Sequence, residues 1–462
     1  MIAPMPKLKF AAAMVISKSA CIGMKLLHRQ ASYLPGKIAL KLCHDFLSQI
    51  GRPETVVAVT GTNGKTTVSN LLNGVLTSAG YEVSNNSAGS NIDAGVASCL
   101  IENSTFSGKA KKKLAVLECD ERSSLRIYPH LKPDFIVCTN IMRDSVKRNA
   151  NTDFISYIIS SALPETTRMI VNADDILCSA LGHEANPRVS FGVSHRFGTE
   201  SDSIQGIVKD VTYCPVCGQE LKAEYIRYNH IGRVYCPECS FRSLTPDYEV
   251  TKVEKNAITV SHGGTETVYP LPNDNITNIY NTVAAIALLT ELGLTDEQIR
   301  TGLGGSKIVS SRFHRETCCG KTITLQLAKS QNPIACSRAF DYLRRSEGEK
   351  KTAIVIIDDI HDNVGNTENI CWIHDCDYSP FADPSVKQVV FGGPRCHDHM
   401  LRALLDGVDP AKITLTDDYF HAIDQVTYED TDSIFILYDL YLADKAKVIR
   451  DHLREKLEGM DK

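Results

Sequence analysis

A glycine-containing segment between a predicted strand and a predicted helix constrains the fold more than any other feature of the chain. Residues 60–67 read Thr-Gly-Thr-Asn-Gly-Lys-Thr-Thr. Residues 55–59 before it are mostly β-branched, which predicts a buried parallel strand, and apolar residues after it recur at helical spacing until Gly80. In such a loop, backbone N–H groups surround phosphate oxygens, and the helix N-terminus adds a favourable dipole. The sequence therefore predicts an α/β domain that binds a nucleotide.

Residues 60–67, here called the phosphate loop, have distinct expected roles. Lys65 would reach the β- and γ-phosphates, and the Thr66 hydroxyl would ligate Mg²⁺. The loop departs from the pattern G-x-x-x-x-G-K-[ST] because Val59 stands where the first glycine is expected, and a tight structural turn is the alternative interpretation. The nucleotide contacts that we expect are Gly61, Thr62, Asn63, Gly64, Lys65, Thr66 and Thr67.

Length and charge narrow the class of protein. At 462 residues the chain is too long for one ordinary core, which predicts two or three domains. The formal net charge of −5 argues against a generally nucleic-acid-binding surface, although it leaves room for a local basic patch. Sixteen cysteines are spread along the chain, and many unpaired thiols beside a nucleotide site indicate the cytoplasm.

The N-terminal segment permits three interpretations. Residues 10–16 are apolar and follow two lysines, as in a signal peptide, but Lys18 interrupts the run and no clear cleavage site follows. No stretch approaches the roughly 20 apolar residues that span a bilayer. We expect residues 10–28 to form a helix that packs on the core; an amphipathic helix that touches a partner, or the inner face of the membrane, is the alternative.

The order of predicted elements divides the chain into three regions. Residues 1–50 are expected to be helical, residues 51–305 to form a doubly wound, mainly parallel α/β domain, and residues 306–462 to form a second, Rossmann-like α/β domain. The strands predicted after the phosphate loop are 114–118, 135–139, 168–171, 188–191, 323–327, 353–357, 388–391 and 433–437. The later helices predicted are 277–292, one opened by a capping box at Thr295, and those near 334–345, 395–406 and 440–457.

Polar side chains follow three successive predicted strands. Glu118 ends the first, Asn140 and Asp144 follow the second, and Asp174 and Asp175 follow the third. Open α/β sheets bind their ligands at the carboxyl ends of the strands, so a carboxylate there is suited to hold the Mg²⁺ that bridges phosphates. The sequence therefore predicts a ligand-lined edge of the sheet, with capping or surface acids as the alternative.

Two C-x-x-C pairs predict a metal site. Cys214 and Cys217 are followed, after eighteen residues, by Cys236 and Cys239. Paired knuckles at this separation suit tetrahedral zinc, whereas a redox C-x-x-C usually occurs once. Four thiolates leave no open coordination position, so we expect a structural zinc ribbon, inserted at about 206–246. Its aromatic and basic residues also permit nucleic-acid binding, although such residues are ordinary in a small ribbon.

Two later segments carry candidate ligands or catalytic groups. Asn278 and Asn281 share one edge of the helix predicted at 277–292 and could read a base. Residues 358–385 form a polar, acid-rich segment that contains the only tryptophan, Trp372, and the sequence His-Asp-Cys-Asp at 374–377. A positioned carboxylate and a merely solvated loop are both compatible with this pattern.

The phosphate loop resembles the ATP loop of the Mur ligases. By this resemblance Glu118 is the strand-end glutamate that handles Mg²⁺, and the segment from Asn140 through Asp144 to Arg148 is similar to the family's N-x-x-x-D…R segment. The nucleotide-binding residues that the resemblance adds are Asn278 and Asn281 beside the adenine and Arg312 at the hinge.

Within that family the chain resembles the MurT-type group. The resemblance rests on Leu-Pro-Gly-Lys-Ile-Ala-Leu at 34–40, on the four-cysteine insertion and on Trp-Ile-His-Asp-Cys-Asp at 372–377. The departures are Ser145 in place of a metal-binding histidine, Ser311 in place of a glycine and His374 in place of an aromatic residue. The first of these puts a second Mg²⁺ site in doubt.

The resemblance implies a function. It is the ATP-dependent amidation of the D-glutamate carboxylate in the stem peptide of lipid II, through an acyl phosphate, to D-isoglutamine. No convincing glutaminase Cys–His motif is visible, and the resemblance implies that ammonia comes from a separate GatD-type glutaminase in a heterodimer. By resemblance an aspartate of the C-terminal domain completes the partner's Cys–His triad, and Asp375 is the first choice, with Asp377 second.

Two other functions fit parts of the sequence. The first is a conventional Mur- or folylpolyglutamate-type ligase that adds an amino acid, against which the zinc insertion and the 372–377 segment argue. The second is a non-enzymatic ATP-binding zinc-ribbon module.

Overall fold

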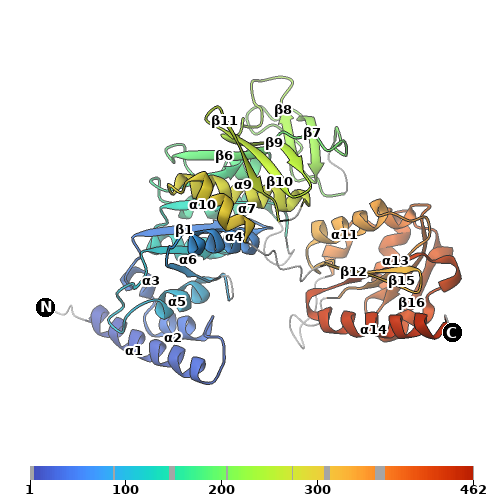
Figure 1. Ribbon diagram of the computed structural model, residues 1–462, viewed down its shortest axis with the longest axis horizontal. Coiled ribbons are helices and arrows are strands. Elements are labelled where there is room, and N and C mark those ends of the chain that lie inside the picture. Colours follow the sequence, from blue (N-terminus) through green and yellow to red (C-terminus); the bar gives the residue numbers. More distant parts are fainter. Residues whose placement is uncertain are drawn as a thin grey trace. The chain divides into compact units, whose positions relative to one another are not determined.

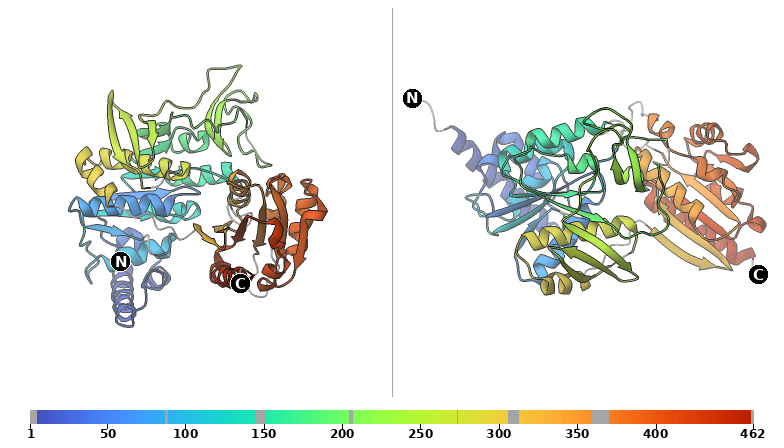
Figure 2. Two further views of the ribbon diagram at one scale, coloured as in Figure 1. Left: turned by 45° about the vertical axis from the view of Figure 1, so that its right-hand side comes forward. Right: turned by 90° about the horizontal axis from the view of Figure 1, so that it is seen from above.

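The computed structural model divides into two compact units (Figures 1 and 2). Unit 1 comprises Met1–Met142, Asn151–Ser203 and Val211–Ile308, and unit 2 comprises Arg143–Ala150, Ile204–Asp210 and Val309–Lys462. The residues that the structure describes are 5–86, 89–144, 151–203, 207–272, 274–305, 313–358 and 370–460.

Unit 1 is built on a nine-stranded sheet with the order β11-β10-β9-β6-β5-β4-β1-β3-β2. The strands β2 to β6 and β1 pair in parallel, β9 joins β6 in parallel, and β10 and β11 are antiparallel. The strands are β1 Thr55–Thr60, β2 Val83–Asn85, β3 Leu114–Glu118, β4 Phe135–Cys138, β5 Arg168–Asn172, β6 Arg188–Val193, β9 Tyr248–Glu254, β10 Ala257–His262 and β11 Thr265–Pro270. The five parallel strands predicted from sequence are confirmed.

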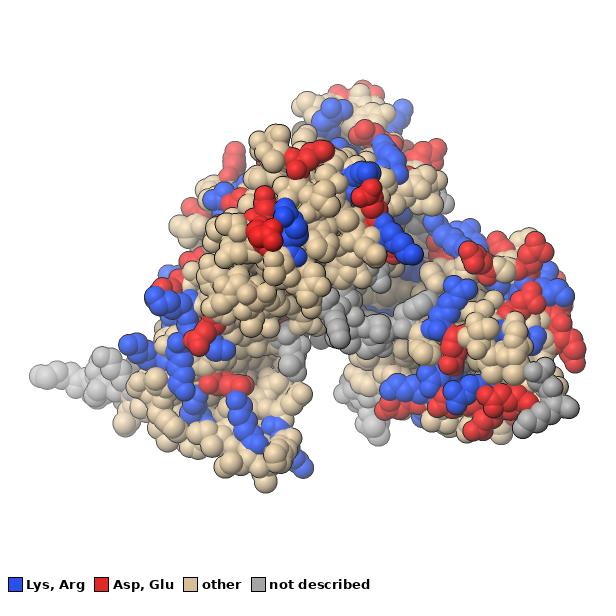
Figure 3. Space-filling model, in the orientation of Figure 1, with Lys and Arg blue, Asp and Glu red and all other residues tan. Residues whose placement is uncertain are grey.

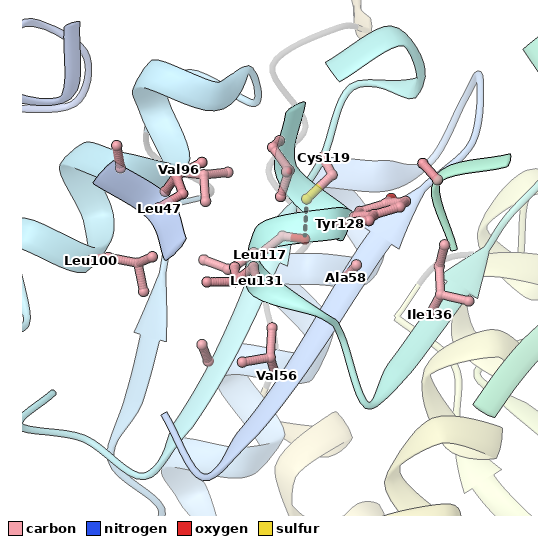
Figure 4. Close-up of a cluster of buried hydrophobic side chains, with 14 of the residues drawn as sticks. Leu47, Val56, Ala58, Val96, Leu100, Leu117, Cys119, Tyr128, Leu131 and Ile136 are labelled. Atoms are coloured by element: carbon pink, nitrogen blue, oxygen red, sulfur yellow. Dashed lines mark hydrogen bonds between the residues drawn. The ribbon is translucent and has the colours of Figure 1, made fainter. Parts of the chain in front are cut away.

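The central strands are apolar on both faces because helices cover both faces of the sheet. In β1, residues 56–59 are all buried. One face packs against the core cluster drawn in Figure 4, where Val56 and Ala58 meet Leu117, Leu131 and other buried side chains. The helices of unit 1 are α1 Met5–Leu26, α2 Leu34–Leu42, α3 Phe46–Gln49, α4 Lys65–Ser78, α5 Asp93–Glu102, α6 Ser124–Leu131, α7 Thr152–Ala162, α8 Ile176–Ser179, α9 Ile276–Glu291 and α10 Asp296–Gly304.

The first three helices belong to unit 1; α1 and α2 pack on α5, and α3 packs on α6. Gly36 lies so close to α5 that a Cβ there would stand 1.9 Å from the carbonyl oxygen of Ala94, which explains the glycine. The Leu-Pro-Gly segment begins α2, with Pro35 in its first turn, where a missing N–H costs nothing. Lys18 of α1 donates to the carbonyl oxygens of Ile101, Glu102 and Ser104 at 2.6–2.9 Å, so it caps the C-terminus of α5.

Strand β2 and three strands at the other end of the sheet, β9, β10 and β11, were not predicted from sequence. Buried residues alternate with more exposed ones in β10 and in the first half of β9, whereas β11 has a single buried residue, Tyr269. Their turn signal was present, since Gly263 and Gly264 connect β10 and β11 with positive φ angles. A separate two-stranded hairpin, β7 Lys222–Tyr228 and β8 Ile231–Tyr235, lies between the cysteine pairs.

Unit 2 contains a six-stranded sheet with the order β12-β13-β17-β14-β15-β16. All pairs are parallel except β12 with β13. The strands are β12 Phe313–Cys318, β13 Lys321–Leu327, β14 Lys351–Ile356, β15 Val386–Gly392, β16 Ile413–Thr416 and β17 Ser433–Tyr438. The helices are α11 Pro333–Arg345, α12 Cys371–His374, α13 Cys396–Leu405 and α14 Ala443–Met460. The four predicted strands and three predicted helices are confirmed, and β12 and β16 were missed.

Candidate active site

The turn of the phosphate loop begins two residues later than the general motif suggests. Val59 is still within β1, where it pairs with Glu118 of β3 on one side and Val137 of β4 on the other. The turn starts at Gly61, whose φ of +119° suits glycine, and a Cβ there would lie 2.3 Å from Thr139 Oγ1. A valine at position 59 is therefore compatible with the loop because that position is strand.

The segment after β4 holds the phosphate loop in place. Asn140 binds both backbone groups of Asn63: its Oδ1 accepts from the Asn63 N–H at 3.1 Å, and its Nδ2 donates to the Asn63 carbonyl at 3.0 Å. Thr139 Oγ1 donates to the same carbonyl at 2.6 Å. Met142 exchanges two hydrogen bonds with the Thr62 hydroxyl, at 2.8 and 3.0 Å. Asn140 is thus placed as a support for the loop.

Lys65 forms a salt bridge that the sequence analysis missed. Its Nζ lies 2.7 Å from Glu121 Oε1 and donates to the Gly61 carbonyl at 2.5 Å. Glu121 is almost fully buried, and burial raises its pKa, although Lys65 partly offsets this effect. The signal was a glutamate three residues beyond β3, in the turn where the side chain of Asp120 accepts from the N–H groups of Arg122 and Ser123.

The strand-end acids divide into a candidate site residue, Glu118, and a structural pair, Asp174 and Asp175. Glu118 is buried, and its Oε1 accepts from Asn91 Nδ2 at 3.1 Å, at the carboxyl end of β3. Asp174 and Asp175 are fully buried and accept from several protein donors, among them the Tyr280 hydroxyl at 2.6 Å on Asp174. The expectation that a third polar cluster lines the ligand edge is therefore wrong, because these buried carboxylates already accept hydrogen bonds from protein groups.

Helix α9 brings Asn281 to the phosphate loop. A Cβ on Gly64 would lie 2.2 Å from Asn281 Oδ1, and the Gly64 φ of +92° also suits glycine. Asn278 lies one turn earlier on α9, half-buried. Thr66 and Thr67 are half-buried in the first turn of α4. Residues of the sequence-based assignment that fall outside the described residues are Ser145, Arg148, Ser311 and Arg312.

The four predicted zinc ligands come together. Their sulfur atoms all lie within 4.8 Å of one another, with 3.6 Å between Cys214 and Cys239 and 3.5 Å between Cys217 and Cys236. Tetrahedral zinc with Zn–S bonds of about 2.3 Å separates its sulfurs by about 3.8 Å. The cluster therefore fits one zinc ion, with no position left for substrate.

The hairpin between these cysteine pairs connects to the phosphate loop. His230 Nε2 lies 3.1 Å from Asp175 Oδ1, and Asp175 Oδ2 accepts from the Ile141 N–H at 2.8 Å. Ile141 directly follows Asn140, whose side chain forms hydrogen bonds with the backbone of Asn63. The ribbon thus supports the loop through buried hydrogen bonds.

Replacing Cys217 by serine is expected to remove the zinc, lower the melting temperature by several degrees and weaken ATP binding, because the β7–β8 hairpin loses its closure. Metal analysis, thermal unfolding and nucleotide titration would measure the three effects. The matched control is Cys319→Ser, an exposed cysteine in the β12–β13 turn. Full zinc content in Cys217→Ser would contradict the ligand assignment.

In unit 2 the two candidate aspartates differ in their surroundings. Trp372 of α12 is buried in the core, and Asp375 follows that helix with about a third of its side chain exposed. Asp375 Oδ2 lies 3.3 Å from Nη1 of Arg143. Nη2 of the same arginine lies 3.0 Å from Oδ1 of Asp210, whose side chain is buried. Asp377 Oδ1 instead accepts from the Ser379 N–H at 3.0 Å and stabilises its own turn. Only Asp375 combines exposure with a cationic neighbour.

Asp144 also lies in unit 2. Its Oδ1 accepts from Asn332 Nδ2 at 2.7 Å and is 3.4 Å from Lys329 Nζ. The contacts of Arg143 with Asp375 and of Asp144 with Asn332 join positions 232 and 188 residues apart, so the sequence carried no signal for them.

Family models match both units. The Mur ligase middle domain matches residues 59–233, and the MurT ligase C-terminal domain matches residues 329–441. The first match includes the phosphate loop and the first cysteine pair, Cys214 and Cys217, and ends before Cys236 and Cys239; the second includes Asp375.

Similar proteins cover nearly the whole chain. The MurT subunit of lipid II isoglutaminyl synthase (glutamine-hydrolyzing) from Staphylococcus aureus is 29% identical over 412 residues, which are 88% of this chain and 90% of that protein. The subunit of the same name from Streptococcus pneumoniae is 28% identical over 419 residues, again 88% of this chain and 90% of that protein.

Solved structures share the fold. A pseudomurein peptide ligase type C from Methanothermus fervidus has a TM-score of 0.66 at 18% identity and covers 89% of this chain and 81% of its own. The MurF ligase of Thermotoga maritima, solved in complex with ADP, has a TM-score of 0.57 at 14% identity and covers 92% and 85%. With two family models in the expected order and relatives aligned along most of its length, the chain belongs to the Mur ligase family and is an ATP-dependent ligase with a MurT-type C-terminal domain.

Proposed function

We propose that the chain is the synthetase subunit of a lipid II isoglutaminyl synthase. It would convert the D-glutamate carboxylate of the lipid II stem peptide into the amide of D-isoglutamine. The observation that carries this proposal is the pairing of an ATP loop with a MurT-type C-terminal domain in one chain, aligned over 88% of its length with two MurT subunits.

The chemistry needs two steps because a carboxylate oxygen is a poor leaving group at neutral pH. A carboxylate oxygen attacks the γ-phosphorus of ATP and the bond to ADP breaks, which gives an acyl phosphate. Ammonia then attacks the carbonyl carbon, phosphate leaves and a proton is lost. Lys65 and the backbone N–H groups of the phosphate loop would stabilise charge on the transferring phosphoryl group. Lys65 must exchange its contact with Glu121 for one with phosphate.

The other residues that we assign to ATP and Mg²⁺ are chosen by their positions relative to the phosphate loop or by the family resemblance. Thr66 and Glu118 offer oxygen donors at the start of α4 and the end of β3, which suit Mg²⁺, and that ion would neutralise phosphate charge. Asn281 beside Gly64, with Asn278, would face the nucleoside, and Arg312 would contact the nucleotide at the hinge. A structural zinc at the four cysteines would hold the hairpin that supports the loop.

Ammonia would be supplied by a GatD-type glutaminase that forms a heterodimer with this chain. Asp375 would orient the histidine of the partner's Cys–His pair, as the acid of a triad does, with Asp377 as the second choice. The partial exposure of Asp375 supports this assignment, since a carboxylate must be accessible to act on another chain. Because lipid II is a membrane lipid, the complex would work at the inner face of the membrane.

The proposal is tested by co-expressing the chain with a candidate glutaminase and supplying lipid II, ATP and glutamine labelled with ¹⁵N in the side-chain amide. We expect the two proteins to co-purify and the label to appear in the stem-peptide amide by mass spectrometry. Ligation of a free amino acid by the chain alone would instead identify a conventional Mur- or folylpolyglutamate-type ligase.

A further inference from the structure

Helix α1 differs from an ordinary surface helix because apolar side chains lie on its solvent side as well as on its inner side. Its solvent side carries Leu8 and Leu26, each about three-quarters exposed, with Val15, Ile16 and Ile22 between them at 42–49% exposure. Its inner side carries Ser17 and Lys18, both buried. The spacing of Leu8, Val15 and Ile22 by seven residues places the exposed apolar side chains on one face.

The inner face of α1 is already fixed to unit 1. Ala13, Met14 and Cys21 are buried, Phe10 packs on Phe46 with ring centroids 5.2 Å apart, and Lys18 caps α5. The helix is therefore already packed on unit 1 through its inner face, and its outer apolar face is not needed for that packing. Among the described residues, nothing covers it.

The N-terminal segment that forms this face is rich in cations. The first 44 residues contain six lysines and one arginine and no aspartate or glutamate, whereas the whole chain has a net charge of −5. In Figure 3, the region where Figure 1 places α1 and α2 is mostly tan and blue. The exposed cations of this segment are Lys9, Lys25, Arg29, Lys37 and Lys41, of which Lys25 forms an ion pair with Glu102 at 2.5 Å.

We propose that the outer face of α1 docks on the surface of an anionic lipid bilayer. Exposed leucine, valine and isoleucine side chains on one face, flanked by cations, are the features of a helix that lies in the membrane interface. No described helix is long and apolar enough to cross a membrane, so the helix would lie on the bilayer. The excess of cations in the first 44 residues favours an anionic surface. The choice of a bilayer over an acidic protein rests on the proposed lipid-linked substrate.

The test is co-sedimentation of the full-length chain with vesicles of phosphatidylcholine containing one-third phosphatidylglycerol, and with vesicles of phosphatidylcholine alone. We expect binding to the anionic vesicles that weakens as salt is added. The variant Val15→Asp/Ile22→Asp should reduce that binding at least tenfold. The matched control is Tyr157→Asp/Val268→Asp, which exchanges two other exposed apolar side chains with the same change of charge.

Each outcome decides the proposal. Equal binding by the α1 variant and the wild type, or no binding by the wild type to anionic vesicles, would overturn it. Thermal unfolding of the variant should match the wild type, because both substituted side chains are half-exposed. Amidation of lipid II dissolved in detergent micelles should survive in the α1 variant, so a failure of docking and a failure of the proposed enzymatic function are distinguishable.

Discussion

The variant Lys65→Ala should lose amidation with glutamine and with ammonium alike, by at least about 10²–10³-fold, the effect of removing one donor that stabilises a transition state. Phosphoryl transfer precedes the use of ammonia, so the nitrogen source should not matter. The measurement is the rate of lipid II amidation, with ADP release followed in parallel. Lys113→Ala, a change at an exposed lysine before β3, is the matched control and should leave both rates unchanged.

Because Lys65 forms a salt bridge with Glu121, the variant Lys65→Ala should also lose stability. Removing the Lys65 ammonium takes a cation away from a fully buried carboxylate whose pKa burial already raises, which favours the protonated form and costs stability. The double variant Lys65→Ala/Glu121→Gln removes that charge as well, and should recover the melting temperature without recovering activity. Activity within a few-fold of the wild type in either variant would refute the role of Lys65.

The sequence predicted most of the parallel strands because they are buried on both faces. Runs such as 55–59 and 114–118 are continuous and apolar, which short edge strands are not. Strands β9–β11 lie at one end of the sheet with one or two buried residues each, and β16 is only half-buried, so none of them forms a continuous buried apolar run. The same reasoning explains Val59: a motif counted in residues could not show that β1 extends to Thr60.

The candidate site was predictable where a short motif carries the chemistry and not where distant residues meet. The cysteine pairs and the phosphate loop are local, so their geometry could be anticipated. Glu118 and Asp174 both follow parallel strands, and no sequence pattern distinguishes them. The difference is that Tyr280, from a helix a hundred residues later, donates to Asp174. The contact between Arg143 and Asp375 is likewise tertiary.

The variant Asp375→Asn should lose glutamine-driven amidation while it keeps amidation with added ammonium. An aspartate that orients a histidine cannot be replaced by an amide, which favours the wrong tautomer, and in a comparable triad the rate falls by about 10⁴-fold. The ammonium-driven rate depends on the phosphate loop, which belongs to unit 1, whereas Asp375 belongs to unit 2. The ratio of the two rates, measured on the co-purified complex, is the decisive quantity.

Asp377→Asn is the matched control, because Asp377 shares the segment and the charge but its carboxylate accepts from the Ser379 N–H. It should leave the ratio unchanged, and a selective loss of the glutamine-driven rate there would transfer the triad role to Asp377. Equal losses with both nitrogen sources in Asp375→Asn would refute the cross-subunit triad. We do not expect Asp375→Asn to disrupt the local structure and so to lower the rates indirectly. Arg143 keeps its 3.0 Å contact with Asp210 when Asp375 is neutral, so the guanidinium stays paired and the segment that carries Asp375 remains anchored by the buried Trp372.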